Sequence, residues 1–305
     1  MRQPKPGAIR YSLCMRPLSL GAARIDTVLE IETIPMPFAQ FLPASVPELI
    51  AAERAWLVPR HADATLQRGF LTFHTYVIRH AGRTILVDTC MGNDKDRGGH
   101  PIFHGLRTNW LGELEALGVH PDAVDYVMCT HMHGDHVGWN TRLANGRWVP
   151  TFPNARYVFA RREFEARESA WRADESAGYG SFTDSVLPVV ESGQADLVAS
   201  DHEIEGLLQL EAAPGHTPGN VVIHLRSQHA HAIFSGDTIH HPLQVKYPEW
   251  SSAFCEDPTT SAACRRRFVE THADTTTLIL PAHFPLPTAG HIRSDRDRWR
   301  YAFVD

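Results

Sequence analysis

Alternating hydrophobic and polar positions dominate the first part of the chain. Residues 24–34 place apolar side chains and threonines on one side of a period-two pattern and acidic residues on the other, which predicts a strand. Residues 70–80 and 83–89 form two more such runs around an Ala-Gly turn, and the second run is apolar enough for a central strand. Residues 46–57 instead repeat their apolar positions with helical spacing. We therefore expect an N-terminal stretch packed on a β-rich core.

Beyond this hairpin, the same reasoning predicts strands and helices in a repeating order. Strands are expected at 123–130, 156–160, 207–214, 220–227, 231–237 and 276–283, and helices near 108–117, 162–169, 181–190 and 261–272. The order alternates twice between strand-rich and helix-containing stretches, which suggests two similar halves, each a sheet covered by helices. We expect residues 1–60 to be an N-terminal extension and residues 61–305 to form one catalytic domain.

Composition and charge narrow the class of protein. Hydrophobic residues make up 43% and charged residues 21% of the 305 residues, a globular balance that excludes a disordered or fibrous chain. The net charge of -6 argues against a nucleic-acid partner. The 5 cysteines form no CxxC pair, which favours a reducing compartment. No apolar run is long enough for a membrane span or an export signal, so we expect a cytoplasmic protein with no membrane partner.

The 19 histidines are the outlier in this composition, and their placement carries the chemistry. The predicted strand at 123–130 leads directly into an HxHxDH segment formed by His131, His133, Asp135 and His136. Residues two apart project to the same side of an extended chain, so His131 and His133 can bind one ion. Asp135 and His136 can then face a second ion. Gly134 lets the backbone bend between the two pairs. One short segment can therefore serve two metals.

Three later strand ends add further ligand types. His216 lies in a Pro-Gly turn, Asp237 ends the predicted strand at 231–237, and His283 ends the predicted strand at 276–283. An accidental HxHxDH pattern arises in such a His-rich chain only on the order of once in a few hundred sequences. His216 and Asp237 could instead cap turns, and so could Asp88 at the end of the strand at 83–89. We favour the reading in which the strand ends converge on a metal site.

Together these residues resemble the ordered motifs of the metallo-β-lactamase superfamily, from about residue 70 to residue 283. The resemblance implies an α+β fold, a four-layer αββα sandwich with the metals at one edge of two facing sheets. It implies that a first ion is held by His131, His133 and His216, a second by Asp135, His136 and His283, and that Asp237 bridges them. By the same resemblance, Asp88 orients the ligands.

This ligand set predicts hydrolysis. Two divalent ions can share a water and lower its pKa toward ~7, which supplies hydroxide at neutral pH. Zinc is the expected metal, with Mn²⁺, Fe²⁺ or Co²⁺ as alternatives. Asp135 could pass a proton to the leaving group, so we count Asp135 and Asp88 as catalytic candidates. A one-iron oxygenase of the persulfide dioxygenase type remains an alternative, although the complete second ligand set argues against it.

The residues around the motifs bear on the class of substrate. The HxHGDHVG form and the N-terminal extension resemble the branch of quorum-quenching lactonases and methyl parathion hydrolase-like enzymes, which favours opening of a lactone or cleavage of a small ester. Organophosphate or β-lactam hydrolysis is the alternative within the fold. Trp139, Phe103 and Tyr179 are candidate substrate-binding residues, while His240 is read as a core or surface histidine. The expected partner is a small molecule, and a homodimer is allowed for.

Overall fold

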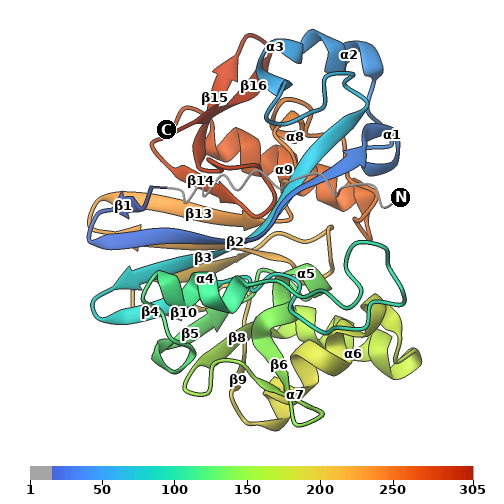
Figure 1. The fold of residues 1–305 in the computed structure, drawn as a ribbon. Coiled ribbons are helices and arrows are strands. Elements are labelled where there is room, and N and C mark those ends of the chain that lie inside the picture. Colours follow the sequence, from blue (N-terminus) through green and yellow to red (C-terminus); the bar gives the residue numbers. More distant parts are fainter. Residues whose placement is uncertain (1–15, 305) are drawn as a thin grey trace, which may run out of the picture.

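The computed structural model describes residues 16–304, which form two facing β-sheets with helices on the outside (Figure 1). The first sheet has 7 strands in the order β1-β2-β3-β4-β5-β8-β9. These are β1 (Leu18–Leu20), β2 (Ala23–Pro37), β3 (Arg68–His80), β4 (Arg83–Val87), β5 (Tyr126–Met128), β8 (Arg156–Ala160) and β9 (Ala195–Val198). The second sheet has 7 strands in the order β10 to β16. These are β10 (Glu203–Ile204), β11 (Leu208–Ala212), β12 (Val221–Ser227), β13 (Ala230–Gly236), β14 (Leu278–Pro281), β15 (Gly290–Asp295) and β16 (Arg298–Phe303).

Helices and a small hairpin complete the described chain. The α-helices are α1 (Phe38–Phe41), α2 (Pro47–Ala52), α3 (Arg54–Leu57), α4 (Trp110–Ala116), α5 (Gly134–Val137), α6 (Arg161–Ala173), α7 (Leu187–Glu191), α8 (Leu243–Lys246) and α9 (Pro258–His272). Short turns of helix are η1 (Pro121–Ala123), η2 (Gly138–Asn140), η3 (Ala177–Gly180) and η4 (Phe182–Val186), and β6 (Thr141–Ala144) pairs with β7 (Arg147–Pro150). Within residues 16–304, no helix combines the length and apolar character needed to cross a bilayer.

The alternation of side chains along each strand produces the layers. On β3, Ile78 faces inward and joins a core shared with Ile223 and Phe234 of the second sheet, whereas its neighbour Val77 faces outward and packs with Leu114 of α4. On the far side, α9 covers the second sheet in the same way. Burying both faces of both sheets gives helix, sheet, sheet and helix layers. The predicted α+β sandwich is confirmed.

The ends of the chain extend the sheets beyond the predicted pattern. Strand β2 pairs with β3 from Arg24 opposite Arg79 to Pro37 opposite Arg68, so the N-terminal stretch supplies a strand of the first sheet. The helix expected at 46–57 forms as α2 and α3. After residue 283, β15 and β16 add two antiparallel strands to the second sheet that the pattern did not predict. The division at residue 60 therefore stays a prediction, and β2 crosses it by pairing with β3.

Strand direction brings the motif loops to one edge of the sandwich. In the first sheet β4 and β5 run parallel, so Asp88 and the HxHxDH segment follow their carboxyl ends on the same side. In the second sheet β13 and β14 are parallel, which does the same for Asp237 and His283. Because β12 is antiparallel to β13, the loop with His216 enters β12 at that edge. The topology alone predicts that these loops meet.

Candidate metal centre

The sequence-predicted ligands meet in two adjoining clusters. Within each cluster, one ligand atom per residue lies within 4.8 Å of the others, and Asp237 belongs to both. The first cluster contains His131, His133, His216 and Asp237, and the second contains Asp135, His136, Asp237 and His283. The structure therefore brings together all the residues that the sequence predicts as metal ligands, in the predicted grouping.

The HxHxDH segment reaches both clusters because it changes conformation at its glycine. His133 is extended and precedes α5, whose first turn holds Asp135 and His136. At Gly134, where a Cβ atom would lie 3.2 Å from the Arg97 Nε, a larger side chain would press on a buried guanidinium. The bend divides the ligands between the two clusters.

In the first cluster, three imidazole nitrogens converge. The His216 Nε2 lies 3.1 Å from the His131 Nε2 and 2.9 Å from the His133 Nδ1. The same His216 nitrogen lies 3.1 Å from the Asp237 Oδ2. Burial lowers the pKa of His133 to about 3 and that of His131 well below its usual value. Neutral imidazoles present lone pairs, which is the form that binds a metal.

The second cluster has the same character with more carboxylate. The His283 Nε2 lies 3.2 Å from the His136 Nε2 and 2.9 Å from the Asp237 Oδ1. The Asp135 Oδ2 lies 3.4 Å from each of these two histidines. Burial alone would raise the pKa of Asp135, but charge on His136 and His283 holds it below its usual range. Asp135 therefore contributes an ionised oxygen.

This donor set fits divalent cations. The Asp237 Oδ1 is buried and accepts no well-aligned hydrogen bond from any described residue, although an imidazole nitrogen is only 2.9 Å away. Buried carboxylate oxygens and imidazole nitrogens gathered this closely are stabilised by positive charge between them, which protons supply in the metal-free protein and a metal ion would supply when bound. Imidazole nitrogen and carboxylate oxygen are zinc ligands, and the shared carboxylate suits a pair of ions.

Asp88 lies where the resemblance places an orienting residue. Its Oδ2 lies 2.8 Å from the His136 Nδ1, and it accepts hydrogen bonds from the backbone N–H and the hydroxyl of Thr130, at 2.8 and 2.9 Å. These contacts fix the His136 ring so that its Nε2 faces the second cluster. Asp88 also anchors the residue that precedes the HxHxDH segment.

Two further side chains lie beside the centre: His240, for which the sequence favoured a core or surface position, and Cys255, which the sequence did not indicate. The His240 Nε2 lies 3.2 Å from the Asp237 Oδ2, and the Cys255 Sγ lies 3.7 Å from the His216 Nδ1. Both side chains are buried. The one signal for His240 was its position three residues after Asp237, and the chain gave none for Cys255.

Glu163 on α6 was also missed, although it connects the two loops of the first cluster. Its carboxylate accepts hydrogen bonds from the Met132 backbone N–H at 3.2 Å, the Thr217 hydroxyl at 2.7 Å and the Gly219 backbone N–H at 3.0 Å. Met132 lies between two of the predicted ligands, and Thr217 follows His216. Glu163 is 31 residues from Met132 and 54 residues from Thr217 in the chain, so no local pattern could reveal these contacts.

The three predicted substrate residues lie in different surroundings. Phe103 packs edge-on against Phe73, with 5.5 Å between ring centroids, and Phe73 packs against His283 at 4.8 Å. Tyr179 is 63% exposed, and its ring lies 6.2 Å from that of His100.

Trp139 is buried in the core instead. Its ring stacks on Trp110 at 5.2 Å, and its Nε1 donates a hydrogen bond to Glu30. Neither contact is with a candidate ligand.

Comparison with curated proteins finds relatives among lactonases. N-acyl homoserine lactonase AttM of Azorhizobium caulinodans is 34% identical over 114 residues, which cover 36% of this chain and 39% of that protein. N-acyl homoserine lactonase AiiA of Bacillus thuringiensis subsp. kurstaki is 25% identical over 120 residues, 39% of this chain and 40% of that protein. The chain thus matches about two fifths of the length of these relatives.

Solved structures show the same fold over nearly the whole chain. The hydrolase AbOPH, described as a member of the β-lactamase superfamily, has a TM-score of 0.77 at 21% identity, covering 95% of this chain and 97% of its own. AidC, a dizinc quorum-quenching lactonase in complex with a product, has a TM-score of 0.72 at 19% identity, covering 95% and 98%. The family model described as metallo-beta-lactamase superfamily matches residues 69–283. With this match over most of its length and the clustered His and Asp ligands, the chain belongs to the metallo-β-lactamase superfamily.

Proposed function

We propose that the protein is a metal-dependent hydrolase that opens a lactone or cleaves a small ester, with two divalent ions in its active site. The observation that carries the proposal is the shared carboxylate. Asp237 is the one residue common to both clusters, and its two oxygens face different histidines, Oδ2 toward His216 and Oδ1 toward His283. A carboxylate in that position is the bridge that a two-metal site needs.

The chain's residues divide the work of such a site. When bound, two divalent ions supply a nucleophile by lowering the pKa of a water held between them. His131 and His133 stay neutral and offer lone pairs, and Asp88 holds the His136 ring in place. Burial keeps bulk water away from these groups, which strengthens every electrostatic interaction among them.

Asp135 is the candidate that moves a proton. Its side chain is 20% exposed, whereas those of His136, Asp237 and His283 are at most 4% exposed. Its Oδ2 is therefore the ligand oxygen of the second cluster most open to a substrate. We propose that this oxygen accepts the proton that the attacking water loses and passes it to the leaving alkoxide, since such a group must lie within hydrogen-bond reach of both.

The surroundings favour an apolar substrate. Phe73 joins Phe103 to the metal centre as a continuous aromatic edge, which suits an acyl chain or a ring better than a polyanion. The matched relatives are N-acyl homoserine lactonases, and their substrates carry both a lactone and an acyl chain. A lactone with an acyl substituent is accordingly the first substrate class to test.

The test combines metal content with a substrate screen. Zinc-loaded protein is expected to bind about two equivalents per chain and to open acyl lactones or aryl esters, while His283→Ala lowers the stoichiometry toward one. Asp237→Asn should lower kcat far more than it raises KM, because a bridging carboxylate organises the site and touches substrate little. Asp297→Asn, an exposed aspartate in the β15–β16 turn, is the matched control.

Two results would overturn the proposal. One is a single iron per chain with oxygen consumption. The other is fully metal-loaded protein that leaves lactones and esters intact while it cleaves phosphotriesters or β-lactams.

A further inference from the structure

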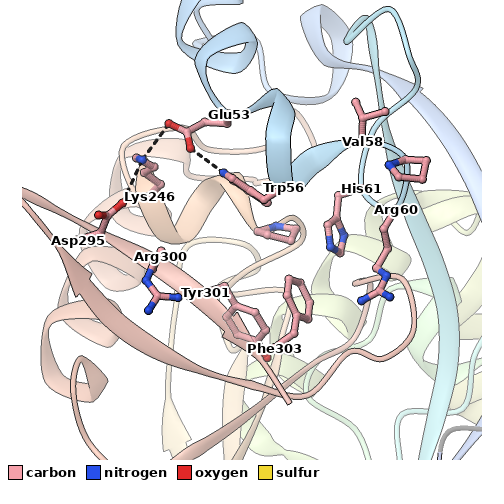
Figure 2. A pocket seen from close by; sticks show the side chains of 12 residues that line it. Glu53, Trp56, Val58, Arg60, His61, Lys246, Asp295, Arg300, Tyr301 and Phe303 are labelled. Carbon is pink, nitrogen blue, oxygen red and sulfur yellow. Dashed lines mark hydrogen bonds and ion pairs between the residues drawn. The ribbon is translucent and has the colours of Figure 1, made fainter. Parts of the chain in front are cut away.

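A second cavity lies between the N-terminal segment and the last strands, apart from the metal centre (Figure 2). It has a volume of about 410 Å³ and is lined by residues 53–61, the start and end of α8, and the hairpin β15–β16. None of the candidate metal ligands lines it. His241 separates the two sites, since its Nε2 lies 2.9 Å from the carbonyl oxygen of His61 and its neighbour His240 faces Asp237. The size is within the usual range for small-molecule pockets, ~300–1,000 Å³.

One wall of the cavity is a continuous set of aromatic rings. His61 stacks on Phe303 with 4.7 Å between ring centroids and 12° between planes. Trp56 contacts His61 at 6.2 Å, and Tyr301 meets Phe303 edge-on at 4.8 Å. Flat, rigid rings of this kind offer a large contact area for a planar ligand at little entropic cost.

The charged side chains that line the cavity leave two arginines free. Lys246 neutralises the acidic ones, because its Nζ lies 2.8 Å from Glu53 and 3.3 Å from Asp295. The side chains of Arg60 and Arg300 make no hydrogen bond or ion pair with any residue in the range 16–304. Figure 2 shows these two arginines on either side of the Phe303 ring. The unpaired charge at the cavity is therefore positive.

His61, which also lines the cavity, has a buried ring nitrogen without a hydrogen-bond partner among the described residues. This nitrogen is Nδ1, and the residue is 2% exposed. Burial lowers the pKa of this ring to about 3, so it is neutral at physiological pH. Buried polar atoms in native proteins are nearly always paired with protein, water or ligand, and a lone one needs an explanation.

We propose that this cavity is a binding site for a small aromatic carboxylate. The ring of the ligand lies against the aromatic wall formed by Trp56, His61 and Phe303, and its carboxylate reaches one of the two arginines that flank this wall, Arg60 or Arg300 (Figure 2). Guanidinium groups match the planar geometry of a carboxylate and form charge-assisted hydrogen bonds with it. The inference does not depend on which reaction the metal centre catalyses.

The experiment is a calorimetric titration of 1-naphthoate into the zinc-loaded full-length protein. We expect saturable binding that is weakened at least tenfold when Arg60→Ala and Arg300→Ala are combined. Arg142→Ala is the matched control, because this exposed arginine on β6 lies outside the cavity. The uncharged analogue 1-naphthamide should also bind at least tenfold more weakly than 1-naphthoate. Thermal melts establish that each variant is folded.

A carboxylate could also bind to the metal ions, so the titration is repeated after chelation. Binding at the proposed cavity persists in the metal-free protein and still depends on the two arginines. Binding that disappears with the metal and is indifferent to Arg60 and Arg300 overturns the proposal. Absence of saturable binding up to millimolar 1-naphthoate overturns it as well.

Discussion

Replacing Glu163 should destabilise the loops that hold the first cluster, although it removes no candidate metal ligand. The carboxylate is buried and receives hydrogen bonds from two backbone N–H groups, those of Met132 and Gly219, and from the Thr217 hydroxyl. Glu163→Ala leaves the two backbone donors unpaired in a closely packed site. Even a Cβ on Gly219 would lie 2.1 Å from the Glu163 backbone nitrogen, so there is little room for a compensating shift.

The expected cost follows from these contacts. A buried donor left unpaired costs about 1–3 kcal/mol, and hydrogen bonds to a charged group contribute about 1.5–3 kcal/mol each. Such terms are not additive, so we expect Glu163→Ala to lower the free energy of unfolding by about 3–5 kcal/mol. Glu163→Gln keeps the volume and one acceptor oxygen and should lie between wild type and Ala. Thr217→Val removes one donor to the carboxylate and should cost about 1.5–3 kcal/mol.

Denaturant unfolding of the chelator-treated protein measures this cost free of metal binding. Glu165→Ala is the matched control, because Glu165 is an exposed residue of the same helix. Zinc affinity gives the second readout. Because Glu163 ties the loop of His131 and His133 to the loop of His216, its removal should weaken zinc binding at the first cluster by about 10–100-fold.

Either of two results would contradict this role of Glu163. One is a Glu163→Ala protein whose unfolding free energy lies within about 1 kcal/mol of the Glu165→Ala value, since an unpaired buried donor alone costs about that much. The other is unchanged zinc affinity at the first cluster in the folded Gln variant. In a double-mutant cycle of Glu163→Ala and Thr217→Val, the losses of unfolding free energy should not be additive, because the two side chains share a hydrogen bond.

Three further predictions concern the stability of the fold. Chelation should lower Tm, because ions tie together loops from both sheets, and an unchanged Tm after verified metal removal would contradict a site that links the sheets. Trp139→Ala should cost about 3–5 kcal/mol in unfolding free energy, since the ring is buried against Trp110, and a change confined to KM would contradict its place in the core. The pKa of His61 is about 3 in the fold against 6.5 unfolded, so wild-type stability falls as pH drops through this window. Relative to pH 7, His61→Phe should lose about 2 kcal/mol less than wild type by pH 5, and equal losses in chelator-treated samples would contradict this.

The ligands could be predicted from the sequence because their geometry is local. His131, His133, Asp135 and His136 lie within six consecutive residues, and backbone direction alone divides them between two ions. His216, Asp237 and His283 each lie at a strand boundary, where a chain that feeds a parallel or antiparallel neighbour must return to the same edge. The sandwich follows from the same strand pattern.

The supporting residues could not be predicted this way, since their roles depend on which distant segments meet. Glu163 reads as one acidic residue in a helix with several others, and only the approach of the loop at residues 214–219 turns it into a buried acceptor. For Trp139, proximity in the sequence suggested a role that the structure does not support. Its distance of three residues from His136 suggested a pocket wall, but the short helical turn η2 directs its side chain into the core.

The layout of the centre implies a division between what binds metal and what adapts to substrate. Buried acceptors anchor the HxHxDH segment and the His216 loop: Asp88 contacts Thr130 and His136, and Glu163 contacts Met132 and Thr217. The aromatic edge of Phe73 and Phe103 is different, because Phe103 belongs to the long segment between β4 and α4 and its ring packs on Phe73, which in turn packs on His283. A substitution at Phe103 can therefore alter the substrate preference without disturbing the ions. On this argument, Phe103→Ala should raise KM for long-chain acyl lactones more than for short ones while zinc stoichiometry stays constant, and a loss of zinc in that variant would refute the separation.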